Sequence, residues 1–152
     1  MWSNAQNTTV IDSYFENNTA YHAGALFFHA TTSNSKIYNS NFVNNRARNY
    51  AGAVRIDGPE NNITYCNFTG NFAENQGGAV VFGVSSLNGR LNNCNFTSNI
   101  ANSYGGAVSW FGVDGILNDC DFKYNSAGNG GAVNWDRFPF GNSLKVFKTA
   151  IF

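Results

Sequence analysis

The sequence that decides the fold reads Leu91-Asn92-Asn93-Cys94-Asn95-Phe96-Thr97-Ser98-Asn99-Ile100-Ala101-Asn102-Ser103-Tyr104-Gly105-Gly106-Ala107-Val108-Ser109-Trp110. Variants of this stretch fill the rest of the chain. They align on one phenylalanine per repeat, spaced by 27, 26, 28 and 26 residues: Phe15, Phe42, Phe68, Phe96 and Phe122. Self-similarity at such a period is typical of a solenoid, a propeller or an array.

Other positions keep their residue type at fixed offsets from this phenylalanine. An asparagine follows three residues later, at Asn18, Asn45, Asn71, Asn99 and Asn125. A glycine follows nine or ten residues later, at Gly24, Gly52, Gly78, Gly106 and Gly131. Each glycine precedes an alanine, an aliphatic residue and, two positions further, a large apolar residue. Another aliphatic residue lies five positions before the phenylalanine, at Val10, Ile37, Ile63, Leu91 and Leu117.

Each repeat contains two short patterns typical of β-strands. In the first, as in Ile37 to Phe42, the repeat phenylalanine and the residue two positions before it alternate with polar residues. We expect a corner three positions before the phenylalanine (position −3), which brings the aliphatic residue five positions before it inward as well. In the second, two apolar residues flank one of mixed chemistry, which predicts a solvent-facing column at Phe27, Arg55, Val81, Ser109 and Asn134. The glycine before this strand predicts a bend with positive φ.

Equivalent strands of successive repeats run in the same direction, so their pairing gives parallel sheets with like residues stacked about 4.8 Å apart. The predicted fold is all-β: a right-handed parallel β-helix of about five rungs of 26–28 residues, plus partial terminal rungs. A propeller needs longer repeats, and a leucine-rich horseshoe needs a leucine pattern that this sequence lacks.

Composition sets the class of protein. The chain has 152 residues, 43% of them hydrophobic and 12% charged, with nine basic and nine acidic side chains. This balance predicts one packed domain and argues against nucleic acid or an anionic membrane surface as a partner. Because residues 1–3 resemble the end of one more repeat and residues 147–152 the start of another, we expect 1–152 to be a single β-helix segment of a longer protein, in contact with neighbouring repeats of the same chain.

Stacked columns inside a coil form ladders. The phenylalanines would stack ring on ring, and the asparagine amides would hydrogen-bond from one rung to the next. Cys66, Cys94 and Cys120 lie two residues before the phenylalanine and should point inward as a buried ladder of free thiols, because parallel Cβ vectors oppose the torsion of a disulfide.

Catalytic and metal-binding patterns are weak. Asp119 and Asp121 are two apart on one strand but continue a polar column, and His22 and His29 lie in one repeat without a matching nucleophile or ligand cluster. We therefore predict no catalytic residues, no cofactor and no metal site. Length varies mainly after the second strand, so one edge of the coil carries irregular loops. The most distinctive loop contains Asp136, Arg137, Phe138 and Phe140. Either these side chains are exposed and bind a partner, or the apolar ones fold back and pack onto the coil.

Two motifs alternate through the chain: Phe-x-x-Asn, as in Phe68 to Asn71 and Phe96 to Asn99, and Gly-Gly-Ala-Val, as in Gly77 to Val80 and Gly105 to Val108. Their alternation resembles the repeat of chlamydial polymorphic outer-membrane proteins, and also the adhesin-like surface proteins of methanogenic archaea. The resemblance implies a right-handed parallel β-helix in a large cell-surface or secreted adhesin.

Two functions follow as expectations. The first is a non-enzymatic, adhesin-like surface stalk whose loop edge binds an extracellular partner, either a cell-surface glycan or a protein. The alternative is a polysaccharide lyase or a glycoside hydrolase-like β-helix enzyme, for which a convergent charged groove would be the distinguishing feature.

Overall fold

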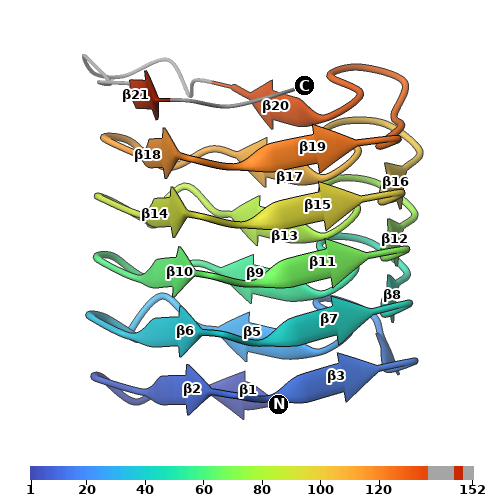
Figure 1. Cartoon of the computed structure of the whole chain (residues 1–152). Coiled ribbons are helices and arrows are strands. Elements are labelled where there is room, and N and C mark those ends of the chain that lie inside the picture. Colours follow the sequence, from blue (N-terminus) through green and yellow to red (C-terminus); the bar gives the residue numbers. More distant parts are fainter. Residues whose placement is uncertain (137–145, 149–152) are drawn as a thin grey trace.

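A computed structural model describes residues 1–136 and the strand at 146–148. The chain winds into about five stacked coils that rise from the N-terminal to the C-terminal end and turn in the right-handed sense (Figure 1). Every strand pairing is parallel, and the described residues contain no helix. The structure therefore confirms the predicted right-handed parallel β-helix.

Four parallel sheets form the walls of the coil. Sheet A contains β1 (Trp2–Ser3), β5 (Leu26–Phe28), β9 (Val54–Ile56), β13 (Val80–Phe82), β17 (Val108–Trp110) and β20 (Val133–Trp135). Sheet B contains β2 (Thr9–Ile11), β6 (Lys36–Tyr38), β10 (Asn62–Thr64), β14 (Arg90–Asn92), β18 (Ile116–Asn118) and β21 (Val146–Lys148). Sheet C contains β3 (Tyr14–Glu16), β7 (Asn41–Val43), β11 (Asn67–Thr69), β15 (Asn95–Thr97) and β19 (Asp121–Lys123). The short sheet D contains β4 (Thr19–Ala20), β8 (Arg46–Ala47), β12 (Phe72–Ala73) and β16 (Ile100–Ala101).

The strand register matches the predicted columns. Phe68 pairs with Phe42 on one side and with Phe96 on the other, and Ile63 pairs with Ile37 and Leu91 in the same way. The predicted corner at −3 is present as well. The residue at this position adopts positive φ in every repeat: Asp12, Asn39, Tyr65, Asn93 and Asp119.

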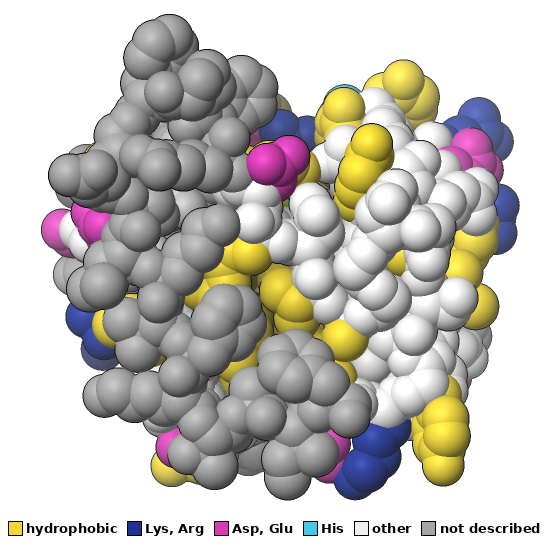
Figure 2. Space-filling view, turned by 90° about the horizontal axis from the view of Figure 1, so that it is seen from above, with side chains coloured by type: hydrophobic (Ala, Val, Ile, Leu, Met, Phe, Trp, Pro, Cys, Tyr) yellow, Lys and Arg dark blue, Asp and Glu magenta, His cyan; other side chains and the backbone are white. Residues whose placement is uncertain are grey.

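Apolar ladders fill the interior. Phe42, Phe68 and Phe96 are fully buried, and successive rings of this column lie parallel with centroids 4.8 to 5.0 Å apart. A second aromatic stack of Phe82, Trp110 and Trp135 lies on the inner face of sheet A. Figure 2 looks down on the β20 end and shows hydrophobic side chains gathered near the centre. Burying these rings supplies the main driving force for the fold.

The predicted asparagine ladder is formed. Oδ1 of Asn71 accepts hydrogen bonds from the backbone N (3.0 Å) and Nδ2 (3.1 Å) of Asn45. Nδ2 of Asn71 donates to Phe42 O and to Asn99 Oδ1, both at 2.9 Å. Asn45, Asn71 and Asn99 are fully buried, so these side chains satisfy backbone groups at a corner that water does not reach.

Cys66, Cys94 and Cys120 are buried free thiols, as the sequence predicts. Each thiol donates to the carbonyl oxygen two residues earlier, which for Cys94 is Asn92 O at 3.2 Å. The serines that replace cysteine in the first two coils make the same bond, as Ser40 does to Tyr38 O. The column thus stabilises the corner between sheets B and C.

Two predictions about the strands are wrong. The first four coils have four strand segments each rather than two, because the corner at −3 splits the first pattern and a two-residue strand of sheet D follows the inner asparagine. The middle column of sheet A is also not uniformly solvent-facing: Val81 and Ser109 are buried. Val81 belongs to a buried cluster with Ala23 and Ala51, against which Tyr50 and Phe111 pack. Ser109 Oγ donates to Tyr104 O.

The expected positive φ of the glycine column is wrong as well. It occurs one residue earlier, at Ala23, Ala51, Gly77, Gly105 and Gly130. The column glycine is required for a different reason, since a Cβ on Gly78 would lie 2.0 Å from Gly106 O and 2.6 Å from Ile100 N. Only glycine permits successive coils to approach so closely at this bend.

Candidate functional site

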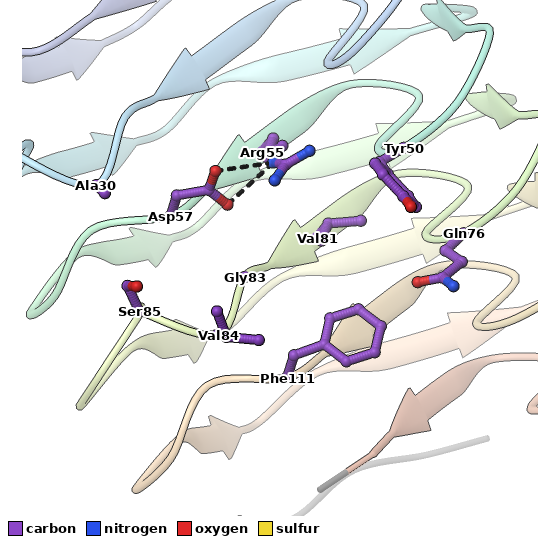
Figure 3. A pocket seen from close by; sticks show the side chains of 10 residues that line it. All are labelled: Ala30, Tyr50, Arg55, Asp57, Gln76, Val81, Gly83, Val84, Ser85 and Phe111. Carbon is purple, nitrogen blue, oxygen red and sulfur yellow. Dashed lines mark hydrogen bonds and ion pairs between the residues drawn. The ribbon is translucent and has the colours of Figure 1, made fainter. Parts of the chain in front are cut away.

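A pocket of about 330 Å³ opens on the outer face of sheet A, beside the irregular loops. It is lined by four coils, with Ala30 after β5, Arg55 and Asp57 at the end of β9, Val81 and Gly83 at the end of β13, and Phe111 directly after β17 (Figure 3). Tyr50 and Gln76 bound it on the side where the chain enters sheet A. Val84 and Ser85 bound it on the loop side. A volume near 300 Å³ lies at the small end of the range for ligand sites.

The pocket exists because Gly83 has no side chain in a column where the neighbouring coils have Asp57 and Phe111. The residues that follow the six strands of sheet A are Asn4, His29, Asp57, Gly83, Phe111 and Asp136. A Cβ at Gly83 would lie 2.2 Å from Asp57 Oδ1, so this glycine leaves room for the Asp57 side chain and for the hollow between Asp57 and Phe111. The buried side chain of Val81 lies beneath as an apolar floor.

Arg55 and Asp57 form an ion pair in this pocket. Arg55 Nε donates to both carboxylate oxygens, at 2.9 and 3.0 Å, and the two side chains are only 22% and 17% exposed. The guanidinium carbon lies 5.2 Å from the ring centroid of Phe27 and 5.3 Å from that of Tyr50. These contacts hold Arg55 in one orientation, with its remaining N–H groups next to the pocket (Figure 3).

His22 flanks the same cluster. Its ring stacks on Tyr50 with the centroids 5.5 Å apart and the planes 6° from parallel, and it meets the edge of Tyr21. Burial and the positive charge of Arg55 lower the pKa of His22 below its ordinary value of 6.5, and the Asp57 carboxylate opposes them. His22 is therefore neutral at pH 7, and the charges of the cluster cancel.

The loop residues predicted to bind a partner are mostly outside the described part of the chain. Asp136 is described: it is exposed, and its backbone N donates to Trp110 O at 3.1 Å. Arg137, Phe138 and Phe140 lie outside the described residues. The prediction that recognition residues lie on the loop edge stays a prediction.

The structure places Asp119 and Asp121 away from the pocket. Asp119 is at the exposed corner between sheets B and C, where its Oδ2 accepts a bond from Asn118 Nδ2 at 2.7 Å. Asp121, on β19 of sheet C, forms an ion pair with Lys123. Among residues 1–136 and 146–148, no group of three or more His, Cys, Asp and Glu side chains is placed to hold a metal ion, and no helix is long and apolar enough to cross a membrane.

Sequence reasoning missed the pair of Arg55 and Asp57. Two signals pointed to it: the chemistry of the column that contains Arg55 and Val81 changes from repeat to repeat, and Gly83 interrupts a column of side chains. Neither signal shows by itself that the gap is a pocket, because its walls come from four coils.

Comparison with known proteins found no match to this chain. No protein-family model matches the sequence, and neither a curated protein nor a solved structure matches the chain.

Proposed function

We propose that this chain is part of a non-enzymatic, adhesin-like stalk at a cell surface and that it binds an extracellular partner at its loop edge. One observation carries the proposal: the pocket lies where three adjacent coils depart from the repeat, while the phenylalanine and asparagine ladders behind it stay regular. Recognition usually resides in variable surface segments that a rigid scaffold positions. The resemblance of the repeat to surface adhesins agrees with this proposal.

A second candidate function is cleavage of a polysaccharide, which the Arg55–Asp57 pair favours because a basic group and a carboxylate converge in the same hollow. Two features favour binding over cleavage. Both oxygens of Asp57 already accept from Arg55 Nε, and Asp57 is the one carboxylate among the described residues that line the pocket. Most glycoside hydrolases use two carboxylates on either side of the scissile bond.

The test is attachment of the fluorescently labelled chain to a panel of cells and extracellular matrices. The double substitution Val84→Ser and Phe111→Ser changes two pocket walls, and we expect it to reduce attachment at least about fivefold with little change in melting temperature. The matched control is Asp119→Asn with Asp121→Asn on the other side of the coil, which should leave attachment unchanged. If the wild-type chain instead produces new reducing or unsaturated ends from a polysaccharide, and Asp57→Asn abolishes them, the protein is an enzyme.

A further inference from the structure

The pocket presents both signs of charge to whatever occupies it. Arg55 has N–H groups beyond the Nε that bonds Asp57, and the Asp57 oxygens retain lone pairs beyond those that accept from Nε. An anionic ligand group would meet the Asp57 carboxylate, and a cationic one would meet the Arg55 guanidinium. A neutral group that both donates and accepts suits this pair best, and a hydroxyl has that property.

Apolar surface lies beside these polar groups. Phe111 and the buried Val81 form one wall and the floor, and the ring of Tyr50 lies at the opposite side, next to Arg55. Gln76 adds an amide that can donate and accept, and Ser85 adds an exposed hydroxyl at the loop rim. The pocket thus combines apolar faces with several convergent polar groups of net zero charge.

A pyranose ring has matching chemistry, with apolar C–H faces and hydroxyl groups around its edge. We infer that the pocket binds one neutral pyranose sugar, presented as the terminal residue of a glycan. This inference rests on the proposed function, since it names the chemical class of the partner. The limited volume of about 330 Å³ restricts the ligand to a small group rather than a long stretch of polysaccharide.

The direct test is a nuclear magnetic resonance titration of the isotopically labelled chain with methyl glycosides of glucose, galactose, mannose and N-acetylglucosamine. Glucuronic acid and N-acetylneuraminic acid are titrated in parallel as anionic sugars. We expect at least one neutral glycoside to shift the Val81 methyl, Gln76 side-chain amide and Arg55 Nε–H signals saturably, with a dissociation constant of about 1 mM, as expected for a small ligand. The anionic sugars should bind at least about tenfold more weakly.

Two variants test the walls of the pocket. Phe111→Ala removes an apolar face and should weaken binding about tenfold or more. Gln76→Ala removes only a side chain at the rim, and it should weaken binding severalfold while the melting temperature stays unchanged. Arg46 and Glu74 provide a matched control: they form an ion pair at 3.1 Å with the guanidinium 4.2 Å from the Phe72 ring centroid, but on sheet D. Arg46→Gln with Glu74→Gln should leave the titration unchanged.

The outcomes separate this inference from the proposed function. Tighter binding of the anionic sugars, or shifts that persist in Phe111→Ala and Gln76→Ala, would overturn the neutral-sugar assignment. If no sugar shifts the pocket signals but the pocket variants still lose surface attachment, the partner is not a sugar and the adhesive function stands. If a neutral sugar binds but the pocket variants attach to the surface as well as the wild-type chain does, the inference holds and the adhesive function fails.

Discussion

At the scale of single residues, the inner asparagines have a role that their outward counterparts lack. In Asn71→Ala, the backbone N of Asn45 and the carbonyl of Phe42 lose their partner at a buried corner. Leaving such groups unsatisfied costs about 1–3 kcal/mol each, so we expect the free energy of unfolding to fall by about 2 kcal/mol or more. Equilibrium unfolding in urea measures this loss.

The control lies on the outer face of sheet C, where Asn95 Nδ2 donates to Asn67 Oδ1 at 2.9 Å in solvent. Asn95→Ala should cost less than about 1 kcal/mol, because water replaces the lost partner. A larger loss for Asn95 than for Asn71 would contradict the assignment of the inner ladder as the structural one.

The phenylalanine column provides a second test at this scale. Phe96 is fully buried between the rings of Phe68 and Phe122, each 4.8 Å away. Phe96→Ala should destabilise the chain by about 3–5 kcal/mol, since it deletes a buried ring and leaves a cavity. Thr97→Ala, one residue later and on the outer face, should cost less than about 1 kcal/mol. Equal losses in a denaturant series would refute the inward assignment.

His22 makes stability depend on pH. Its folded-state pKa is lowered by burial and by Arg55, so the unfolded chain takes up the proton first as pH falls. The contribution of neutral His22 to the free energy of unfolding is present above pH 6.5, and it is lost as pH falls through the lower folded-state pKa of this residue. We expect His22→Phe, which keeps a ring against Tyr50, to flatten the unfolding free energy across this window. An unfolding free energy that falls just as steeply across this window in His22→Phe would contradict this account.

At the scale of elements, the bend before each strand of sheet A depends on the absence of a side chain. A Cβ on Gly78 would lie 2.0 Å from Gly106 O, and the next coil cannot move away without breaking sheets A and D. Gly78→Ala should therefore cost about 3 kcal/mol or more. At the same position of the last described coil, the nearest described atom to a Cβ on Gly131 is Asn125 O at 3.5 Å. Gly131→Ala should be tolerated, and circular-dichroism melting curves compare the two variants.

The columns of the sequence predicted these elements because each column is one stacked ladder. Spacing alone aligns Phe68 with Phe96 and identifies the corner at Tyr65, since both depend on contacts between equivalent residues. The two-residue strands of sheet D were not predictable in this way, because two residues such as Phe72 and Ala73 show no alternation. The reason for Gly78 was also missed, since a close approach to another coil leaves no local signal.

The candidate site was less predictable than the fold. Its polar residues are near each other in sequence, with Arg55 and Asp57 two apart, but an ion pair in a hollow also needs Gly83 and Phe111 from later coils. Residues that depart from a repeat have no equivalent with which to align. Their neighbours can be known only once the register of the coils is known.

At the scale of the whole molecule, the first coil forms one end of all four sheets within the 152-residue chain. Strands β1 to β4 are the end members of their sheets, and several large apolar side chains are exposed there, including Trp2 (67%) and Ile11 (53%). We expect the 152-residue chain on its own to associate through this end, because unpaired parallel edges and apolar surface favour pairing. Sedimentation velocity over a range of concentrations measures this association.

Placing charge on the edge provides the control. Trp2→Lys with Ile11→Lys should shift the population towards monomer, since edge lysines oppose strand addition. A wild-type chain that stays monomeric at high concentration would contradict the prediction.

The inner asparagine ladder also has a direction. Each Oδ1 accepts from the coil that precedes it, as Asn71 does from Asn45, which lies 26 residues earlier in the chain. On the ribosome, the corner at Asn45 must therefore wait until Asn71 has been made and has left the exit tunnel. The coil is completed one turn behind translation, and the newest turn of a growing chain is always the unfinished one.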